Sequence, residues 1–198
     1  MTFGAGFTRR SSSKASSRDL NDATINAARR GDPAAQRAIV ERHQHAVFAL
    51  VSRMAGADAA DDLAQETFLR VFRALPEFTP HGQARLSTWI LTIGTRVAID
   101  HLRRVKPFQA DVVTLPSSDA SPERAAAAKG LGQRIAAAVE ALPATYRAAF
   151  ILRGYHELSL QEIAQALDCD VNTVKSRLGR ARAMLRSRLR GERDDART

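Results

Sequence analysis

Apolar residues in the last quarter of the chain recur with the spacing of two helices that are only three residues apart. Ile163, Ala164 and Leu167 lie on one side of the first helix, and the apolar stripe of the second is Val171, Val174, Leu178, Ala181 and Leu185. Ser159 and Glu162 have the spacing of a capping box, which starts the first helix near Leu160. Asp170 is suited to cap the second helix. Two helices this close must cross steeply, as they do in a helix-turn-helix.

The second of these helices is basic wherever it is not apolar. Its cationic residues, with no acidic residue before Glu192, are Lys175, Arg177, Arg180, Arg182, Arg186, Arg188 and Arg190. Polar residues stand at its front, where a helix-turn-helix contacts base edges: Asn172, Thr173, Lys175 and Ser176. A charge run alone is equally typical of a solvated helix face. Together with the capping box and the tight turn, it favours binding to the phosphates and base edges of DNA.

The first half of the chain also has a helical period. Asp32 and Pro33 form a helix start, and the apolar side of the helix that follows is Val40, His43, Val47, Leu50, Val51 and Met54. Gly56 ends this helix. A further helix, from about Ala59 to Leu75, has its inner face at Ala64, Phe68, Val71, Phe72 and Leu75. Its outer face carries a polar stripe with an apolar end, formed by Asp62, Gln65, Glu66 and Leu69.

The remaining pattern divides the chain into two parts. Pro76 begins a long loop rich in turn residues, and Ser87 is the expected cap of a helix that runs through Trp89 to Leu102. No helical period is sustained from Val105 to about residue 128, and a new helix is expected over 131–142.

The sequence therefore predicts an all-α fold of two small helical domains joined by a flexible linker, the second being a helix-turn-helix domain. The expected boundaries are a disordered basic tail at 1–19, a first domain at 20–105, a linker at 106–128, a second domain at 129–190 and a disordered tail at 191–198.

Composition narrows the function further. The formal net charge of +9 over 198 residues favours a polyanionic partner. No apolar run approaches the roughly 20 residues of a membrane span, and the N-terminus lacks the apolar core of a secretion signal, so we expect a cytoplasmic protein without membrane insertion. The five histidines have no metal-ligand spacing, and no cofactor or metal site is predicted. Cys169 is the single cysteine, and we interpret it as a small apolar filler rather than a redox sensor.

Three motifs, in this order along residues 20–190, resemble the extracytoplasmic-function group of bacterial sigma factors, which are two-domain initiation subunits of RNA polymerase. They are the segment from Asp61 to Phe68, the segments Ser87–Ile90 and Ala98–Arg104, and the segment from Leu160 to Arg182 with Thr173–Leu178. The resemblance implies a protein without catalytic residues that binds core RNA polymerase, recognises promoter DNA both as a duplex and as a melted strand, and is held inactive by an anti-sigma factor.

The resemblance also implies three sets of site residues. A docking stripe for core polymerase comprises Asp61, Asp62, Gln65, Glu66 and Leu69. A proximal set, for the promoter element that melts, comprises Thr79, His81, Gln83, Arg85, Ser87, Trp89, Arg96, Asp100, Arg103 and Arg104. A distal set, for the upstream duplex element, comprises Asn172, Thr173, Lys175, Ser176, Arg177 and Arg180. A single tryptophan at helical spacing is often a core residue, so Trp89 has that second interpretation.

This chain departs from the family pattern at four of its positions. Leu86 stands where phenylalanine is common, Arg96 where asparagine is common, and Asn172 and Asp168 where glycine is common. The first three bear on promoter preference. Asp168 lies in the turn, where aspartate tolerates a left-handed backbone.

Two other classes of function remain open at this level. One is a stand-alone helix-turn-helix regulator, which binds a symmetric operator without polymerase. The other is an enzyme that uses Asp61, Asp62 and Glu66 as a divalent-metal site, although no histidine or second acidic cluster completes such a site.

Overall fold

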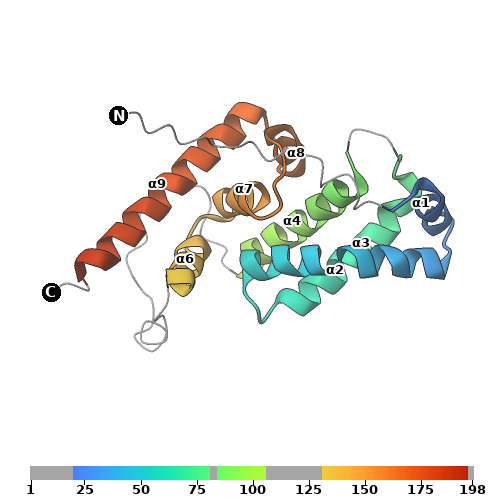
Figure 1. Cartoon of the computed structure of the whole chain (residues 1–198), viewed down its shortest axis with the longest axis horizontal. Helices are drawn as coiled ribbons and strands as arrows, with labels where there is room; N and C mark the ends of the chain where they lie inside the picture. The colour runs from blue at the N-terminus through green and yellow to red at the C-terminus, as the bar shows by residue number, and fades with distance from the viewer. Residues whose placement is uncertain (1–19, 81–83, 106–130, 196–198) are drawn as a thin grey trace, which may run out of the picture.

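The computed structural model describes residues 20–80, 84–105 and 131–195, and every regular element within these ranges is a helix (Figure 1). The all-α class predicted from the sequence is confirmed. In chain order the elements are α1 (Asp22–Arg29), α2 (Pro33–Ala55), α3 (Ala60–Ala74), the 3-10 turn η1 (Leu75–Glu77), α4 (Leu86–Val105), α6 (Leu131–Glu140), α7 (Ala144–Gly154), α8 (Leu160–Ala166) and α9 (Val171–Asp195). The expected tail at 1–19 and linker at 106–128 lie outside the described residues.

Helices α2, α3 and α4 pack against one another and form the first domain, with α1 against α2. Asp32 caps α2 as predicted, because its Oδ1 accepts a hydrogen bond of 2.8 Å from the backbone N–H of Ala35. Gly94 allows α4 to approach closely: a Cβ there would lie 3.2 Å from Cδ2 of Leu50 and 3.4 Å from Cγ2 of Thr67. The core of this domain is completed by Ile39, Val47, Val71, Leu75 and Ile90.

Two boundaries in this domain differ from the sequence prediction. Helix α4 begins at Leu86, and the N–H of Trp89 donates to the carbonyl of Arg85 at 2.9 Å, so Ser87 lies inside the first turn rather than capping it. Helix α1 was not anticipated. Asn21 caps it by accepting from Thr24 N at 2.9 Å, but its only buried residues are Ile25 and Ala28, too few to give a readable period.

The second domain contains α6 to α9, with the helix-turn-helix formed by α8 and α9. The capping box is confirmed: the Ser159 hydroxyl accepts from Glu162 N at 3.2 Å, and Glu162 Oε2 accepts from Ser159 N at 2.8 Å. Asp168 adopts φ of 48°, the left-handed conformation expected for this turn. Helix α9 continues to Asp195, five residues beyond the expected domain end at 190. Glu192 and Arg193 have good helix propensity, and the single Gly191 does not interrupt the helix.

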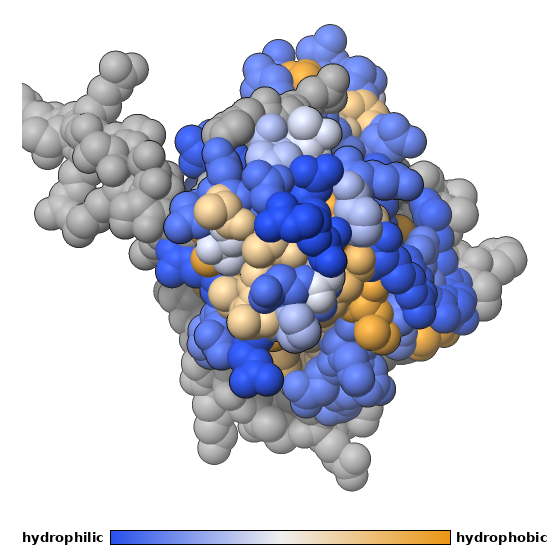
Figure 2. All heavy atoms as spheres, turned by 90° about the vertical axis from the view of Figure 1, so that its right-hand side faces the viewer, coloured by the Kyte–Doolittle hydropathy of each residue, from blue (hydrophilic) through white to orange (hydrophobic). Residues whose placement is uncertain are grey.

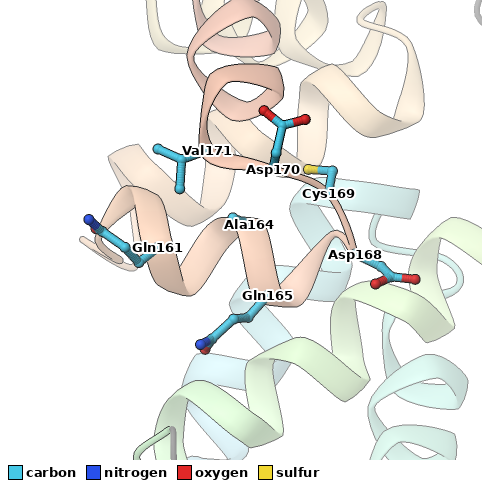
Figure 3. Close-up of a pocket in the computed structure, with 7 residues that line it drawn as sticks. All are labelled: Gln161, Ala164, Gln165, Asp168, Cys169, Asp170 and Val171. Carbon is cyan, nitrogen blue, oxygen red and sulfur yellow. The ribbon is translucent and has the colours of Figure 1, made fainter.

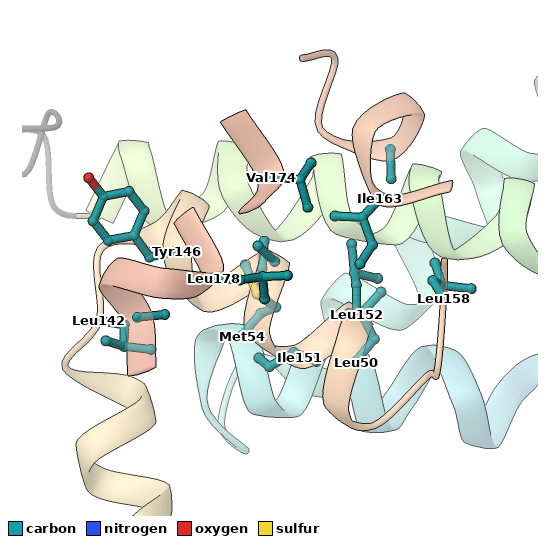
Figure 4. Close-up of a cluster of buried hydrophobic side chains, with 14 of the residues drawn as sticks. Leu50, Met54, Leu142, Tyr146, Ile151, Leu152, Leu158, Ile163, Val174 and Leu178 are labelled. Atoms are coloured by element: carbon teal, nitrogen blue, oxygen red, sulfur yellow. The ribbon is translucent and has the colours of Figure 1, made fainter. Parts of the chain in front are cut away.

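The two domains are packed against each other. Helix α8 lies on α4, and α7 lies on α2 and α4, as Figure 1 also shows. One buried apolar cluster combines Leu50, Met54 and Leu91 of the first domain with residues of the second, including Ile151, Leu152, Leu158 and Ile163 (Figure 4). The helical periods predicted the apolar face of each helix, but they did not predict that faces from both domains share one core.

Candidate nucleic-acid interface

The front of α9 presents polar and cationic side chains from a well-defined helix start. Asp170 fixes that start, because its Oδ1 accepts from Thr173 N at 2.8 Å and its Oδ2 from the Thr173 hydroxyl at 2.5 Å. These hydrogen bonds lower the pKa of Asp170. The Thr173 hydroxyl is therefore already bonded within the helix start. The exposed members of the distal set are Asn172, Lys175, Ser176 and Arg180, and Thr173 and Arg177 are half-buried.

Two arginines of the distal set are held by neighbours in the same domain. Arg180 Nη1 lies 3.1 Å from the hydroxyl of Tyr146, to which it donates from α9 to α7. Arg177 Nη1 lies 3.5 Å from Cys169 Sγ in the turn. Sequence reasoning did not identify Tyr146 as a partner, because it stands 34 residues from Arg180 and no local spacing relates the two.

The turn between α8 and α9 forms a pocket beside this front. Asp168, Cys169 and Asp170 line it together with Gln161 and Gln165 of α8 (Figure 3). Burial raises the pKa of the Cys169 thiol despite the opposing charge of Arg177, with Asp170 and Asp168 adding to the increase. The thiol is therefore protonated at neutral pH, as expected for a filler rather than for a reactive thiolate.

The docking stripe lies along one side of α3. Asp61, Asp62 and Gln65 are exposed, and Leu69 ends the stripe with an apolar side chain that is 46% exposed. An apolar side chain this accessible beside carboxylates is suited to contact a basic protein surface that also has an apolar patch.

Glu66, the remaining member of the docking stripe, is tied to α4 through Arg70. Arg70 Nε lies 2.7 Å from Glu66 Oε1, and its Nη1 lies 3.5 Å from Asp100 Oδ2. The hydrogen bond to Glu66 is the main cause of a raised Arg70 pKa. Arg70 thus joins a residue of the docking stripe to a residue of the proximal set. The spacing of Glu66 and Arg70, four residues along one helix, is a signal from which this pair could have been predicted.

The proximal set is divided between the loop before α4 and one side of α4. Thr79, Arg85, Arg96, Arg103 and Arg104 are exposed, Ser87 is half-buried, and His81 and Gln83 lie outside the described residues. Asp100 pairs with Arg70 of α3. Trp89 is half-buried, and the centre of its ring lies 4.9 Å from the centre of the Phe78 ring, so Trp89 packs at the edge of the first-domain core.

The described residues give no indication of a metal site or of a membrane-spanning helix. Across residues 20–80, 84–105 and 131–195, no three His, Cys, Asp or Glu side chains come together as a group that could hold a metal ion. None of the helices in these ranges combines the length and apolar character that crossing a membrane requires. The end of the molecule that faces the viewer in Figure 2 is mostly hydrophilic, with small apolar areas between.

Comparison with known families agrees with this arrangement of two domains. A profile for sigma-70 region 2 matches residues 39–107, and one for sigma-70 region 4 matches residues 132–185. The ECF RNA polymerase sigma-E factor of Escherichia coli is 32% identical over 170 residues, which cover 80% of this chain and 88% of that protein. The ECF RNA polymerase sigma factor SigE of Mycolicibacterium smegmatis is 34% identical over 157 residues, covering 76% of this chain and 60% of that protein.

Two solved structures have a similar fold. One is CnrH in complex with the cytosolic domain of CnrY, with a TM-score of 0.62 and 26% identity over 85% of this chain and 96% of that chain. The other is the sigma factor RpoE in complex with the anti-sigma factor NepR from Bartonella quintana, with a TM-score of 0.59 and 26% identity over 78% of this chain and 96% of that chain.

Proposed function

Because the chain belongs to the extracytoplasmic-function group of sigma-70 factors, we propose that it binds core RNA polymerase through the docking stripe on α3 and selects promoters through the front of α9. The observation that carries this proposal is that the two surfaces lie in different domains and are both exposed. Polymerase and duplex DNA therefore have separate contact surfaces on one chain. The protein initiates transcription as a binding subunit and contributes no reaction of its own.

The contact with core polymerase is electrostatic and apolar at once. Asp61 and Asp62 supply negative charge near the start of α3, where the helix dipole also favours carboxylates. Leu69 supplies the apolar end of the docking stripe. A basic helical surface with an apolar position fits this stripe, and charge complementarity would guide it into register.

The contact with promoter DNA uses both domains. Lys175 and Arg180 are exposed within the first ten residues of α9, from which they reach phosphates and base edges of the major groove in the upstream element. Arg85, Arg96 and Arg103 are exposed beside or along α4 and would follow the backbone of the DNA that opens. The loop before α4 receives bases of the melted strand.

An anti-sigma factor is a further proposed partner. Of the two similar structures, one contains the anti-sigma factor NepR and the other the cytosolic domain of CnrY. We infer that an inhibitor of this kind binds the present chain and competes with polymerase. The protein would act in the cytoplasm, because that is where bacterial polymerase and chromosome meet.

A charge reversal on α3 tests the docking surface. We expect Asp62→Lys to weaken binding to core polymerase by about tenfold or more, because a cation would then face a basic partner. The measurement is a titration of labelled core polymerase with the full-length chain. Glu41→Lys, which reverses an exposed charge on α2, is the matched control and should leave the affinity within about twofold.

Equal affinities of Asp62→Lys and the unsubstituted chain would remove the docking stripe from the proposal. Failure of the unsubstituted chain to bind core polymerase, combined with tight binding to a symmetric operator, would instead support a stand-alone regulator.

A further inference from the structure

The guanidinium of Arg180 is tied to the body of the second domain by one buried side chain. Arg180 is exposed on α9, and its Nη1 donates to the hydroxyl of Tyr146 at 3.1 Å. This hydrogen bond raises the pKa of Arg180, so it stabilises the charged guanidinium. Among the described residues Arg180 has no second hydrogen-bond partner, which leaves its Nε and Nη2 groups able to donate to a ligand.

Tyr146 is itself held firmly in place. Its side chain is 6% exposed and belongs to the buried cluster that the two domains share, with its hydroxyl on the side away from the labelled leucine and isoleucine side chains (Figure 4). Its backbone N–H donates to the carbonyl of Pro143 at 3.0 Å in the first turn of α7. The next residue, Arg147, is bonded to main-chain carbonyls at the ends of α2 and α6. The tyrosine hydroxyl therefore has a fixed position beside α9.

The arginines farther along α9 have no such anchor. Arg182 and Arg186 are exposed, and neither makes a hydrogen bond to another described residue. A long side chain of this kind loses rotamer freedom when it adopts a single geometry on a ligand. Arg180 has already given up part of that freedom through its contact with Tyr146, so binding in a fixed geometry costs it less.

The remaining donors of Arg180 match a planar pair of acceptors. The Nε and Nη2 groups lie along one edge of the guanidinium, and such an edge fits O6 and N7 of guanine in the major groove. Contact with a phosphate needs the charge but carries no sequence information. Arg180 also lies within the first ten residues of α9, close to the rest of the distal set. An arginine with a fixed plane and an unoccupied edge is thus better suited to read a base than to neutralise a phosphate.

We propose that Tyr146 is a positioning residue that orients Arg180 to read one base pair of the upstream promoter element, with guanine as the base that the unoccupied edge of Arg180 fits. The inference rests on the proposed function of α9 and deepens it, because it separates an arginine that reads sequence from arginines that contact only phosphates. Tyr146 acts through Arg180 rather than on DNA. The discrimination that Arg180 provides should therefore depend on the tyrosine hydroxyl.

Tyr146→Phe tests this role, because phenylalanine keeps the buried ring and removes only the hydroxyl. The variants are studied as full-length chains bound to core polymerase, on promoter fragments in which each base pair of the upstream element is replaced in turn. The measurement is the affinity of the holoenzyme for each fragment, and Arg180→Ala identifies the base pair that this arginine reads. The matched control is Tyr155→Phe, because Tyr155 is an exposed tyrosine at the end of α7 whose ring faces Arg53 of α2.

We expect Arg180→Ala to reduce discrimination at one base pair about tenfold. Tyr146→Phe should reduce discrimination at the same base pair about fivefold, since the hydrogen bond that holds the guanidinium is lost. In the double variant Tyr146→Phe should have no further effect, because both changes act on one contact. Tyr155→Phe should stay within about twofold of the parent on every fragment. Arg182→Ala gives the profile of a phosphate contact for comparison, a loss of similar size on all fragments.

A Tyr146→Phe holoenzyme that loses affinity equally on all fragments, as Arg182→Ala does, would overturn the positioning role, and so would an unchanged profile. A loss at a base pair other than the one that Arg180 reads, or a loss of the same size in the Arg180→Ala background, would also overturn it. In all these cases the proposed function stands. If the parent holoenzyme discriminates no base pair of the upstream element, the proposed function of α9 fails, and the positioning role fails with it.

Discussion

Arg147 joins the two domains through main-chain carbonyls rather than through a carboxylate. Its guanidinium donates to the carbonyl oxygens of Met54, Glu140 and Leu142. Burial lowers its pKa to about 10, partly opposed by the charge of Glu140. The side chain is therefore still charged at neutral pH, and the carbonyl dipoles replace the water that it loses. Neither its burial nor its partners follow from the sequence, in which it is one of many arginines.

His156 gives the free energy of unfolding a pH dependence that can be attributed to one residue. Burial, and secondarily the charge of Arg53, lowers its pKa from 6.5 to about 4, and its Nε2 is buried without a hydrogen-bond partner among the described residues. Between pH 6.5 and 4 the unfolded chain binds a proton that the folded protein does not. Stability is therefore lost as the pH falls through this window. We expect His156→Gln to abolish this decrease in the free energy of unfolding, which amounts to roughly 2 kcal/mol between pH 6.5 and 4. The measurement is urea unfolding across this pH range.

The control for this prediction is His45→Gln, which removes an exposed histidine of α2 and should not change the pH profile. A profile of His156→Gln that is superimposable on that of the parent would show that His156 is not responsible.

At the scale of elements, the turn between α8 and α9 determines how the basic helix is aimed. Asp168 adopts φ of 48°, and the following N–H of Cys169 donates to the carbonyl of Ala164 at 3.0 Å, which closes the end of α8. Asp170 then starts α9. Three residues thus end one helix and begin the next, and the crossing of α8 and α9 follows from their backbone conformation.

Substitutions at Asp168 test this turn. Asp168→Val should destabilise the protein by about 1 kcal/mol or more, because a β-branched residue is strained in the left-handed region, whereas Asp168→Gly should be neutral or stabilising. The measurement is thermal or urea unfolding of the full-length chain. Gln165→Val, at an exposed helical position nearby, is the control for the side chain itself and should cost less. Equal stability of Asp168→Val and Asp168→Gly would contradict the importance of the left-handed conformation.

Elements that have a chemical start signal or a long apolar period were predictable from the sequence. Asp32, Ser159 and Asp170 each cap the helix that local spacing assigned to them. Two starts were missed: α1 is capped by Asn21 but buries only two residues, which is too few for an apolar period to confirm the cap, and α4 starts before Ser87, with Arg85 at the cap position. The continuation of α9 beyond residue 190 is likewise unmarked, because a polar helix and a polar tail have similar compositions.

At the scale of the whole molecule, the sequence predicted two helical domains but not their contact. Leu50, Met54 and Leu91 have the period of core residues, and a period does not identify the helix that covers them. Contacts between side chains of distant segments, such as Thr88 with Glu162 and Arg180 with Tyr146, could not be predicted from the sequence either. The candidate surfaces on α3 and α9 were accessible to sequence reasoning because each lies on one helix face.

We propose that one chain connects core polymerase, through α3, to a promoter, through α9. Run-off transcription with purified core RNA polymerase on genomic promoter fragments tests it most directly. We predict that addition of the full-length chain produces transcripts with discrete start sites that core polymerase alone does not make. Transcription that is unchanged by the chain, on fragments that the chain nevertheless binds tightly without polymerase, would show that the chain does not act through polymerase.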